Sequence, residues 1–356
     1  RGLRLPHLAS TLPTHCDCFP GSGRQHCHAA RMLTVGAGCP CQSAAARTGR
    51  RRSYHGRGFA VSVWVDSMVL LDLILRQHPR SQIIVVHFDH SLRWVESDMD
   101  MELVANICNR EYIKFEAQKM DIGSMAKTEN MNLESIARRE RYRFLEQVRE
   151  KYNAIYILTA HHAVDQTETI IGNMIKWAKV RGLSGILELS GYILKPLLQV
   201  SKLDILWYAE NHRVEYREDS TNQDTSYDRN RIRHDIIPVL ESLNPSIHNT
   251  MSELGLYMQD LGTFLTWQVE NWLKVSEIES GQPDSFLIAS FMSLSPFLQS
   301  EIVSYLYARA QWGSTQCLSH GLIDELIRFV SDPGSYGKKK IKKLSLERRG
   351  ERIILL

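Results

Sequence analysis

Two kinds of apolar pattern alternate along this chain from residue 58 onward, and this alternation limits the folds that it can adopt. Ile83–Phe88 is a continuous, mainly β-branched run, which is typical of a strand buried on both faces of a parallel sheet. Ala154–Thr159 has the same character. Amphipathic stretches separate such runs, with apolar residues three and four apart, at Ser67–Arg76, Glu96–Arg110, Asn132–Tyr152 and Asp165–Ala178. The pattern predicts a doubly wound parallel α/β sheet.

The alternation ends near Pro238–Pro245, and only amphipathic helical segments follow until the last twenty residues. We therefore expect a smaller helical domain after the α/β domain, with no strands between its helices. The last residues contain a basic run and the turn Arg349-Gly350, which favours a hairpin. The expected parts are a leader at 1–57, an α/β domain at 58–245, a helical domain at 246–335 and a hairpin tail at 336–356.

Residues 1–57 differ in composition from the rest of the chain. They contain nine Arg, no Lys and one acid, and five of the seven cysteines. This leader fits a transit peptide or sequence translated from upstream of the true start, so we expect it to be unstructured or non-native. Its Cys-x-Cys spacing does not match a zinc site. The few remaining cysteines favour a reducing compartment, and we expect the cytoplasm.

Charge and hydropathy narrow the range of partners. The chain after the leader holds 34 basic and 39 acidic residues, so a nucleic acid would have to bind local basic patches. No run approaches the roughly 18 apolar residues of a membrane-spanning helix, so no membrane contact is expected.

A short segment joins the first predicted strand to its helix: Ser62, Val63, Trp64, Val65, Asp66 and Ser67. Amide groups and the dipole at a helix start favour anions, so this position suits a phosphate. The hydroxyl groups of Ser62 and Ser67 are candidate donors to phosphate oxygens, and Asp66 is a candidate Mg²⁺ ligand. An ordinary polar turn is the alternative interpretation of these residues.

A second polar segment follows the strand at 154–159. His161, His162 and Asp165 open the next helix, at the edge of the sheet where open α/β folds bind ligands. Asp165 and Glu168 are three residues apart and share one helical face. The alternative is that one of the histidines only caps the helix.

Three basic groups are candidate contacts for an RNA backbone. They are Arg138 and Arg141 on one helical face, the cluster Arg229, Arg231 and Arg233, and the tail residues Lys338, Lys339 and Lys340. Planar guanidinium groups suit phosphates. Each group has the same alternative, a solvated charged surface.

Taken together and in this order, these segments resemble the tRNA(Ile)-lysidine synthases of the PP-loop ATP-pyrophosphatase superfamily. The resemblance covers nearly the whole α/β domain. The matching stretches are Ala60–Leu71, Val86–Arg93, Glu134–Leu145, Ala160–Thr169, Val180–Ile186, Lys195–Leu198 and Asp219–Pro238.

The resemblance implies a ligase that uses ATP and Mg²⁺ to join L-lysine to carbon 2 of the wobble cytidine in tRNA(Ile) with a CAU anticodon. The reaction would pass through an adenylated tRNA. By position, the segment from Ser62 to Ser67 would hold the triphosphate, and His87 and Phe88 would flank the adenine. The implied catalytic residues are Asp66, also the metal ligand, with His161, His162 and Asp165. The three basic groups would contact tRNA, and a homodimer is one expected assembly.

The sequence departs from the family pattern at four positions. Val63, Trp64 and Trp177 stand where the family has glycine, and Val164 stands where it has a second acid. Glycine allows backbone amides to approach phosphates closely, so we expect weakened ATP binding. Two other functions stay open: a tRNA-binding relative without catalysis, and a tRNA thiolase. Thiolase chemistry needs cysteines near the site, and the α/β domain has only Cys108.

Overall fold

The computed structural model describes residues 57–60, 64–90, 94–176, 178–217, 228–311 and 318–356. The leader therefore lies outside the described residues, apart from Arg57. The chain divides into two units. Unit 1 comprises Arg1–Trp177 and Gly185–Gly255, and unit 2 comprises Ala178–Ser184 and Leu256–Leu356. The division lies within a long helix, whereas the sequence pattern placed it near residue 245.

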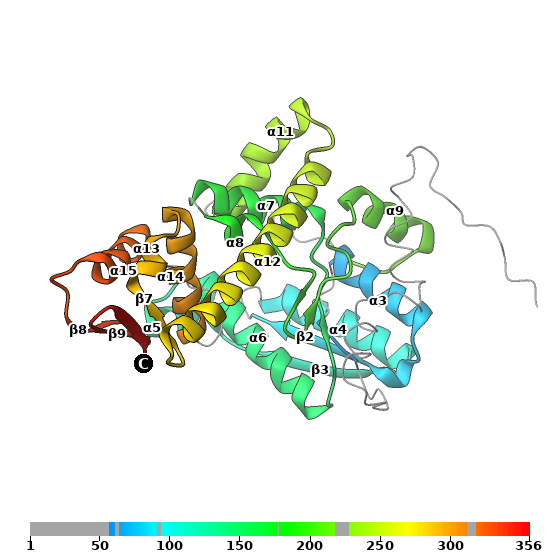
Figure 1. Cartoon of the computed structure of the whole chain (residues 1–356). Helices are drawn as coiled ribbons and strands as arrows, with labels where there is room; N and C mark the ends of the chain where they lie inside the picture. The colour runs from blue at the N-terminus through cyan, green and yellow to red at the C-terminus, as the bar shows by residue number, and fades with distance from the viewer. Residues whose placement is uncertain (1–56, 61–63, 91–93, 177, 218–227, 312–317) are drawn as a thin grey trace, which may run out of the picture. The chain divides into compact units, whose positions relative to one another are not determined.

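Unit 1 contains a six-stranded sheet with the strand order β3-β2-β1-β4-β6-β5. Figure 1 labels β2 and β3 of this sheet. The strands are β1 (Arg57–Ala60), β2 (Ile83–Asp89), β3 (Lys114–Lys119), β4 (Ile157–Leu158), β5 (Leu189–Ser190) and β6 (Ile193–Leu194). Every neighbouring pair is parallel except β5 and β6. The order reverses between β1 and β4, so the sheet has a topological switch point there. The predicted doubly wound α/β fold is confirmed.

Unit 1 also contains helices, and some of them cover both faces of this sheet. The helices are α3 (Val65–Gln77), α4 (Trp94–Arg110), α5 (Ile122–Glu129), α6 (Leu133–Lys151), α7 (Ala163–Ile175), α9 (Lys202–His212), α10 (Asp228–Arg231) and α11 (Ile237–Leu243). A 3₁₀ turn at Arg80–Gln82 precedes β2, and a π-helical turn at Ile232–Ile236 joins α10 to α11.

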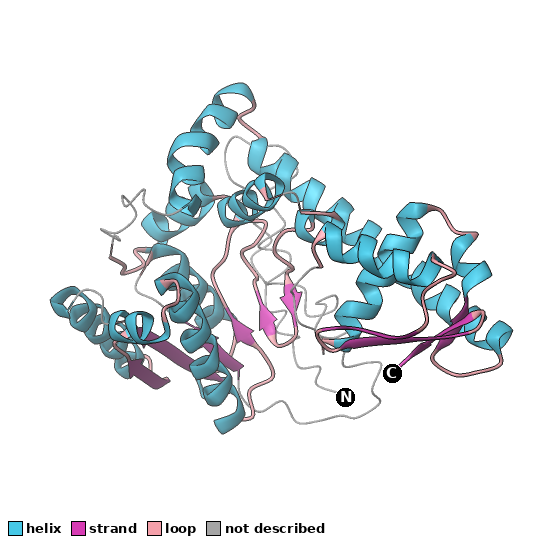
Figure 2. Cartoon of the chain, turned by 90° about the vertical axis from the view of Figure 1, so that its left-hand side faces the viewer, coloured by secondary structure: helices cyan, strands magenta, loops and turns pink. Residues whose placement is uncertain are grey.

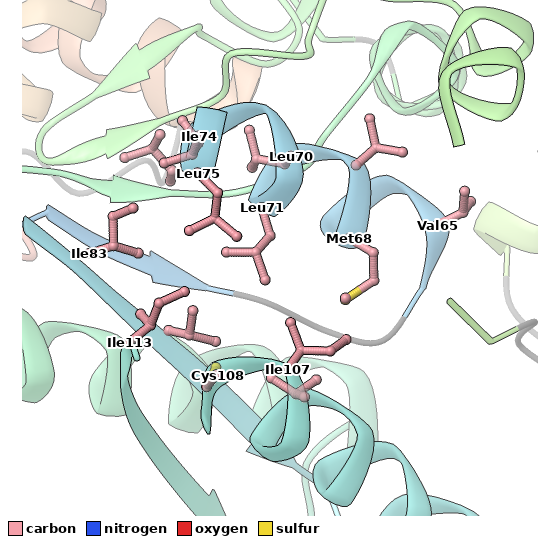
Figure 3. Close-up of a cluster of buried hydrophobic side chains, with 14 of the residues drawn as sticks. Val65, Met68, Leu70, Leu71, Ile74, Leu75, Ile83, Ile107, Cys108 and Ile113 are labelled. Carbon is pink, nitrogen blue, oxygen red and sulfur yellow. The ribbon is translucent and has the colours of Figure 1, made fainter. Parts of the chain in front are cut away.

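Alternate residues of β2 belong to different cores, which is why the strand is apolar along its length. Ile83 and Val85 pack with α3, α4 and α9, whereas Ile84 and Val86 pack with α6. Figure 3 shows Met68 and Leu71 of α3 pointing toward Ile107 of α4. The sheet is therefore buried on both faces, as its continuous apolar run predicted.

Some boundaries differ from the sequence prediction. The sequence pattern also predicts a short strand at Tyr112–Glu116; the observed strand begins at Lys114, because Tyr112 has a positive φ of 55° and belongs to a turn. The strand expected at Ala154–Thr159 is reduced to Ile157–Leu158. Asn153 also has a positive φ, and so the chain is still turning just before that segment.

Unit 2 combines helices with a second sheet. It contains α8 (Val180–Leu183), most of α12 (Ile247–Ser280), β7 (Ser285–Leu287), α13 (Ile288–Met292), α14 (Pro296–Ala310), α15 (His320–Ser331), β8 (Gly337–Ile341), β9 (Leu344–Arg349) and β10 (Arg352–Leu355). The sheet is antiparallel, with the order β7-β10-β9-β8, and Figure 2 shows it close to the C-terminus.

The absence of strands among the helices was a wrong prediction, because β7 pairs with β10. Three residues are too few to give a recognisable period, although Phe286 is buried in the core of unit 2. The tail likewise contributes three strands instead of a two-stranded hairpin. None of the described helices is long and apolar enough to cross a membrane.

Candidate functional site

Four predicted site residues lie close together at the switch point between β1 and β4. We call Asp66, His161, His162 and Asp165 the switch-point cluster. Asp66 is in the first turn of α3, the helix that follows β1. The other three follow β4 and open α7. Because parallel strands end at the same edge of a sheet, both segments reach the place where open α/β sheets bind ligands.

Asp66 is the residue through which the two segments meet. Its Oδ1 lies 3.6 Å from Nε2 of His162. The same oxygen accepts a hydrogen bond of 2.6 Å from Nζ of Lys202, the first residue of α9. The carboxylate is 20% exposed, so it is still accessible from solvent. Lys202 was not predicted, since it follows Asp66 by 136 residues and carries no motif.

His162 caps α7, as the alternative interpretation of the two histidines proposed. Its Nδ1 accepts a hydrogen bond from the backbone N–H of Val164, and Asp165 Oδ2 accepts one of 2.9 Å from the backbone N–H of His162. This reciprocal pair satisfies amide groups that a helix start leaves free. The other ring nitrogen, Nε2, remains directed at the two carboxylates, 3.6 Å from Asp66 and 3.7 Å from Asp165.

Asp165 and Glu168 both bind arginines from α10 and the π-helical turn. Arg229 donates to Asp165 and to Glu168, and Arg233 donates to the other oxygen of Glu168. Glu168 is almost fully buried, with a side chain that is 1% exposed. Burial opposes the ionisation of Asp165, but the electrostatic effect of the neighbouring His162 and Arg229 outweighs it and holds the pKa of this carboxyl below its usual value. These two arginines were predicted as tRNA contacts. In the structure they form ion pairs with Asp165 and Glu168.

His161 is neutral at physiological pH. Its Nδ1 lies 2.9 Å from the hydroxyl oxygen of Thr159. Burial lowers the pKa of His161 to about 4. The negative charge of Asp165 acts to raise this pKa, but the positive charges of Arg141 and Lys195 oppose that effect. The imidazole therefore acts in the cluster as a hydrogen-bonding group and not as a cation.

This lowered pKa predicts acid destabilisation. Between pH 6.5 and about 4 the unfolded chain takes up a proton at His161 that the folded chain excludes, so the free energy of unfolding falls as the pH falls. We expect a loss of roughly 2 kcal/mol from this residue. Urea unfolding at pH 7 and pH 4.5 measures it, and His161→Asn should lose less over the same interval. Equal losses in the two proteins would contradict the prediction.

Arg138 and Arg141 share the face of α6 on which they were predicted. Their guanidinium carbons lie 5.0 and 5.3 Å from the centre of the Tyr142 ring. Burial lowers the pKa of Arg141, which still leaves it charged at neutral pH. Neither residue forms an ion pair with a carboxylate among the described residues, so both cations are available to an anionic ligand.

The remaining predicted residues are placed differently. Ser62 and Val63, and Asp219–Asn222 of the matching stretch, lie outside the described residues. Val65 is buried in the core of unit 1, whereas Ser67 lies in the first turns of α3. His87 is also buried, and Phe88 packs on the rings of His90 and Phe144. Arg231 is exposed and lies 3.8 Å from Asp235. The residues Lys338, Lys339 and Lys340 belong to β8 of unit 2, where Lys339 pairs with Glu325.

Trp64 can be compared with the glycine that the family has at its position. It is the N-cap residue of α3, and its φ of −73° is one that any residue adopts. The backbone of Trp64 is therefore not strained by the replacement of glycine. The indole is 39% exposed beside a helix start that has no side-chain cap, so the remaining obstacle to a phosphate is its bulk.

Val164 and Trp177 are the other two departures. Val164 packs against the apolar cluster of Ile171, Ile232 and Ile237, so the missing acid is replaced by an additional core contact. Trp177 lies outside the described residues.

Sequence reasoning overlooked two further polar residues at this edge of the sheet. His90, which follows β2, has a partly buried ring whose Nδ1 has no hydrogen-bond partner among the described residues, and burial lowers the pKa of this histidine to about 4. Lys195, which follows β6, is a buried cation. Both lie in stretches that match the family, VHFDHSLR and Lys195–Leu198, and that match was the available signal.

A parallel sheet with an uncapped helix start and converging carboxylates at its switch point defines a class of α/β nucleotide-binding domains. The model of one such family, described as the PP-loop domain, matches residues 44–240. The chain therefore belongs to the PP-loop family.

Curated relatives carry a more specific name. The chain is 32% identical over 280 residues to a tRNA(Ile)-lysidine synthase of Bacillus thuringiensis subsp. konkukian, and 33% identical over 257 residues to one of Bacillus licheniformis. These alignments cover 76% and 69% of this chain, but only 58% and 54% of the relatives. The chain thus spans somewhat more than half the length of the relatives that it matches.

Among solved structures, the fold of this chain is similar to that of the U34-tRNA thiolase NcsA from Methanococcus maripaludis. The match covers 58% of this chain and 74% of the thiolase chain. The sequence identity is 17% and the TM-score is 0.48.

Proposed function

We propose that this chain catalyses the ATP-dependent ligation of L-lysine to carbon 2 of the wobble cytidine in tRNA(Ile) with a CAU anticodon. The observation that carries the proposal is the meeting of Asp66 with His162 and Asp165 at the switch point of a PP-loop sheet. The identity of about 32% to proteins named tRNA(Ile)-lysidine synthase supports this substrate and this reaction.

The reaction has two bond exchanges. The carbonyl oxygen at carbon 2 of the cytidine attacks the α-phosphorus of ATP, forming an oxygen–phosphorus bond and releasing pyrophosphate. The ε-amine of lysine then attacks carbon 2, loses a proton and displaces AMP. Such chemistry depends mainly on positioning and charge neutralisation. In this chain the start of α3 would face the phosphates, while neutral His161 and the carboxylate of Asp165 would orient the reacting groups.

Asp66 fits a role as a Mg²⁺ ligand. Mg²⁺ is usually held by one or two carboxylates together with substrate phosphates, not by a complete protein cage. The described residues hold no group of three or more side chains that could bind a metal ion by themselves. When bound, the ion would neutralise charge on the leaving pyrophosphate. Lys202, which now pairs with Asp66, would then be free to contact a phosphate oxygen.

The proposal also assigns residues that contact tRNA, phosphate and adenine. Arg138 and Arg141 are proposed to contact phosphate or tRNA, and the exposed residues Lys338 and Lys340 to attract the tRNA backbone. Adenine is proposed to lie beside the end of β2, near Phe88. A homodimer and a cytoplasmic location stay predictions.

A tRNA-binding relative without efficient catalysis is the second candidate. The exposed Trp64 at the start of α3 favours it, because its indole competes with a phosphate for the same space. A thiolase has less support. In the described part of unit 1 the only cysteine is Cys108, which is fully buried in the core, and burial raises the pKa of its thiol to about 12.

ATP–pyrophosphate exchange in the presence of the CAU tRNA tests the proposal. We expect exchange that depends on this tRNA and formation of lysidine when lysine is added. A transcript with uridine in place of the wobble cytidine is the matched control and should support neither. Tight binding of the CAU tRNA without exchange would instead identify the non-catalytic relative.

A further inference from the structure

Lys195 is a buried cation that has no counter-ion among the described residues. The residue directly follows β6 and is 7% exposed. Its ammonium group donates one hydrogen bond, 2.9 Å long, to the carbonyl oxygen of Leu187. Among the described residues it forms no ion pair with a carboxylate. Two of its three N–H donors therefore have no partner in the part of the chain that the structure describes, although buried lysines are almost always paired.

This residue lies next to the switch-point cluster. Strand β6 pairs in parallel with β4, with Leu158 opposite Leu194. The carbonyl oxygen of Leu194 accepts the backbone N–H of Thr159 at 3.0 Å. Thr159 in turn contacts His161 through its side chain. Lys195 and His161 are therefore placed by two adjacent strand ends on the same edge of the sheet.

Near this edge, Lys195, Arg138 and Arg141 form no ion pair with a carboxylate of the described residues. Burial lowers the pKa of Lys195, and the charge of Arg138 lowers it further. The charges of Lys195 and Arg141 in turn both act on His161. The nearby acids do not offset them, because Asp165 and Glu168 bind Arg229 and Arg233.

We infer that Lys195, together with Arg138 and Arg141, forms a binding site for one phosphate group beside His161. An ammonium group supplies a compact charge, and two guanidinium groups supply planar forks, a combination that suits phosphate oxygens. The inference rests on the proposed function for the source of the phosphate. That source is either the α-phosphate of the nucleotide or a phosphodiester of the tRNA next to the target cytidine.

A purely structural role for Lys195 predicts different behaviour. If the residue served only to hold the Leu187 carbonyl, Lys195→Met would destabilise the fold and would leave anion binding by the folded protein unchanged. If it binds a phosphate, the same variant should be at least as stable as the wild type, because an unpaired buried charge is removed. Its affinity for a phosphate-bearing ligand should fall by about 10- to 100-fold.

The experiment uses the full chain, with AMP and an anticodon stem-loop of the CAU tRNA as separate probes. Binding is measured by calorimetry, and thermal unfolding is measured with and without each probe. Loss of affinity for AMP alone assigns the site to the nucleotide, and loss for the stem-loop alone assigns it to the tRNA. Lys195→Arg, which keeps the charge, should retain more affinity than Lys195→Met.

Lys127→Met is the matched control, because Lys127 is exposed on α5 and its removal changes the net charge equally. It should bind both probes as the wild type does. Unchanged binding of both probes by Lys195→Met would overturn the inference, as would a wild-type chain that binds neither probe. No step of the test requires lysine or turnover. A chain that fails to make lysidine but loses affinity in Lys195→Met would therefore refute the proposed function and leave the phosphate site standing.

Discussion

Replacing both Val63 and Trp64 by glycine is expected to raise the rate of ATP–pyrophosphate exchange by about 10- to 100-fold. Glycine lets backbone amides approach a phosphate, and the double change also removes the indole that stands beside the start of α3. The φ of Trp64 is already unstrained, so the gain at this position comes from lost bulk.

Two single variants separate these causes. Trp64→Ala removes the indole but keeps a Cβ atom, and it should recover part of the gain. Val63→Gly alone tests the neighbouring backbone. An exchange rate in the double variant no higher than in the wild type would show that neither side chain limits ATP binding.

Glu168→Ala is expected to lower the free energy of unfolding by about 2–4 kcal/mol. The change removes a carboxylate that is 1% exposed and accepts hydrogen bonds from both Arg229 and Arg233. The two guanidinium groups would be left against a partly buried surface without their counter-ion. Urea unfolding followed by circular dichroism measures the change.

The pair of Arg139 with Glu129 gives a matched control. Arg139 donates two hydrogen bonds of 2.7 Å to the two oxygens of Glu129, but this pair lies on the surface. Because solvent screens exposed ion pairs, Glu129→Ala should have little effect on stability. A double variant, Glu168→Ala with Arg229→Met, should be more stable than Glu168→Ala alone. Equal stability of Glu168→Ala and Glu129→Ala would mean that burial does not strengthen the ion pairs of Glu168 with Arg229 and Arg233.

Part of the site could be predicted because strand ends and helix starts leave local signals. The apolar run at Ile83–Phe88 indicated a buried strand. The polar residues after the first predicted strand and after residue 159 marked the ligand-binding edge. The start of α6 was predicted at Asn132, whose side chain caps that helix. These features depend on residues within one turn or one strand, so the linear sequence contains them.

By itself, then, the sequence determined the α/β class, the position of the switch-point segments and the resemblance to a PP-loop ligase. Only the tertiary structure decided which charges have partners. Arg229 and Glu168 are 61 residues apart, and Lys202 and Asp66 are 136 apart. Periodicity records whether a side chain is buried, but a salt bridge depends on distances that exist only after the chain has folded. For the same reason, Lys195 could be identified as an unpaired buried cation only in the folded chain.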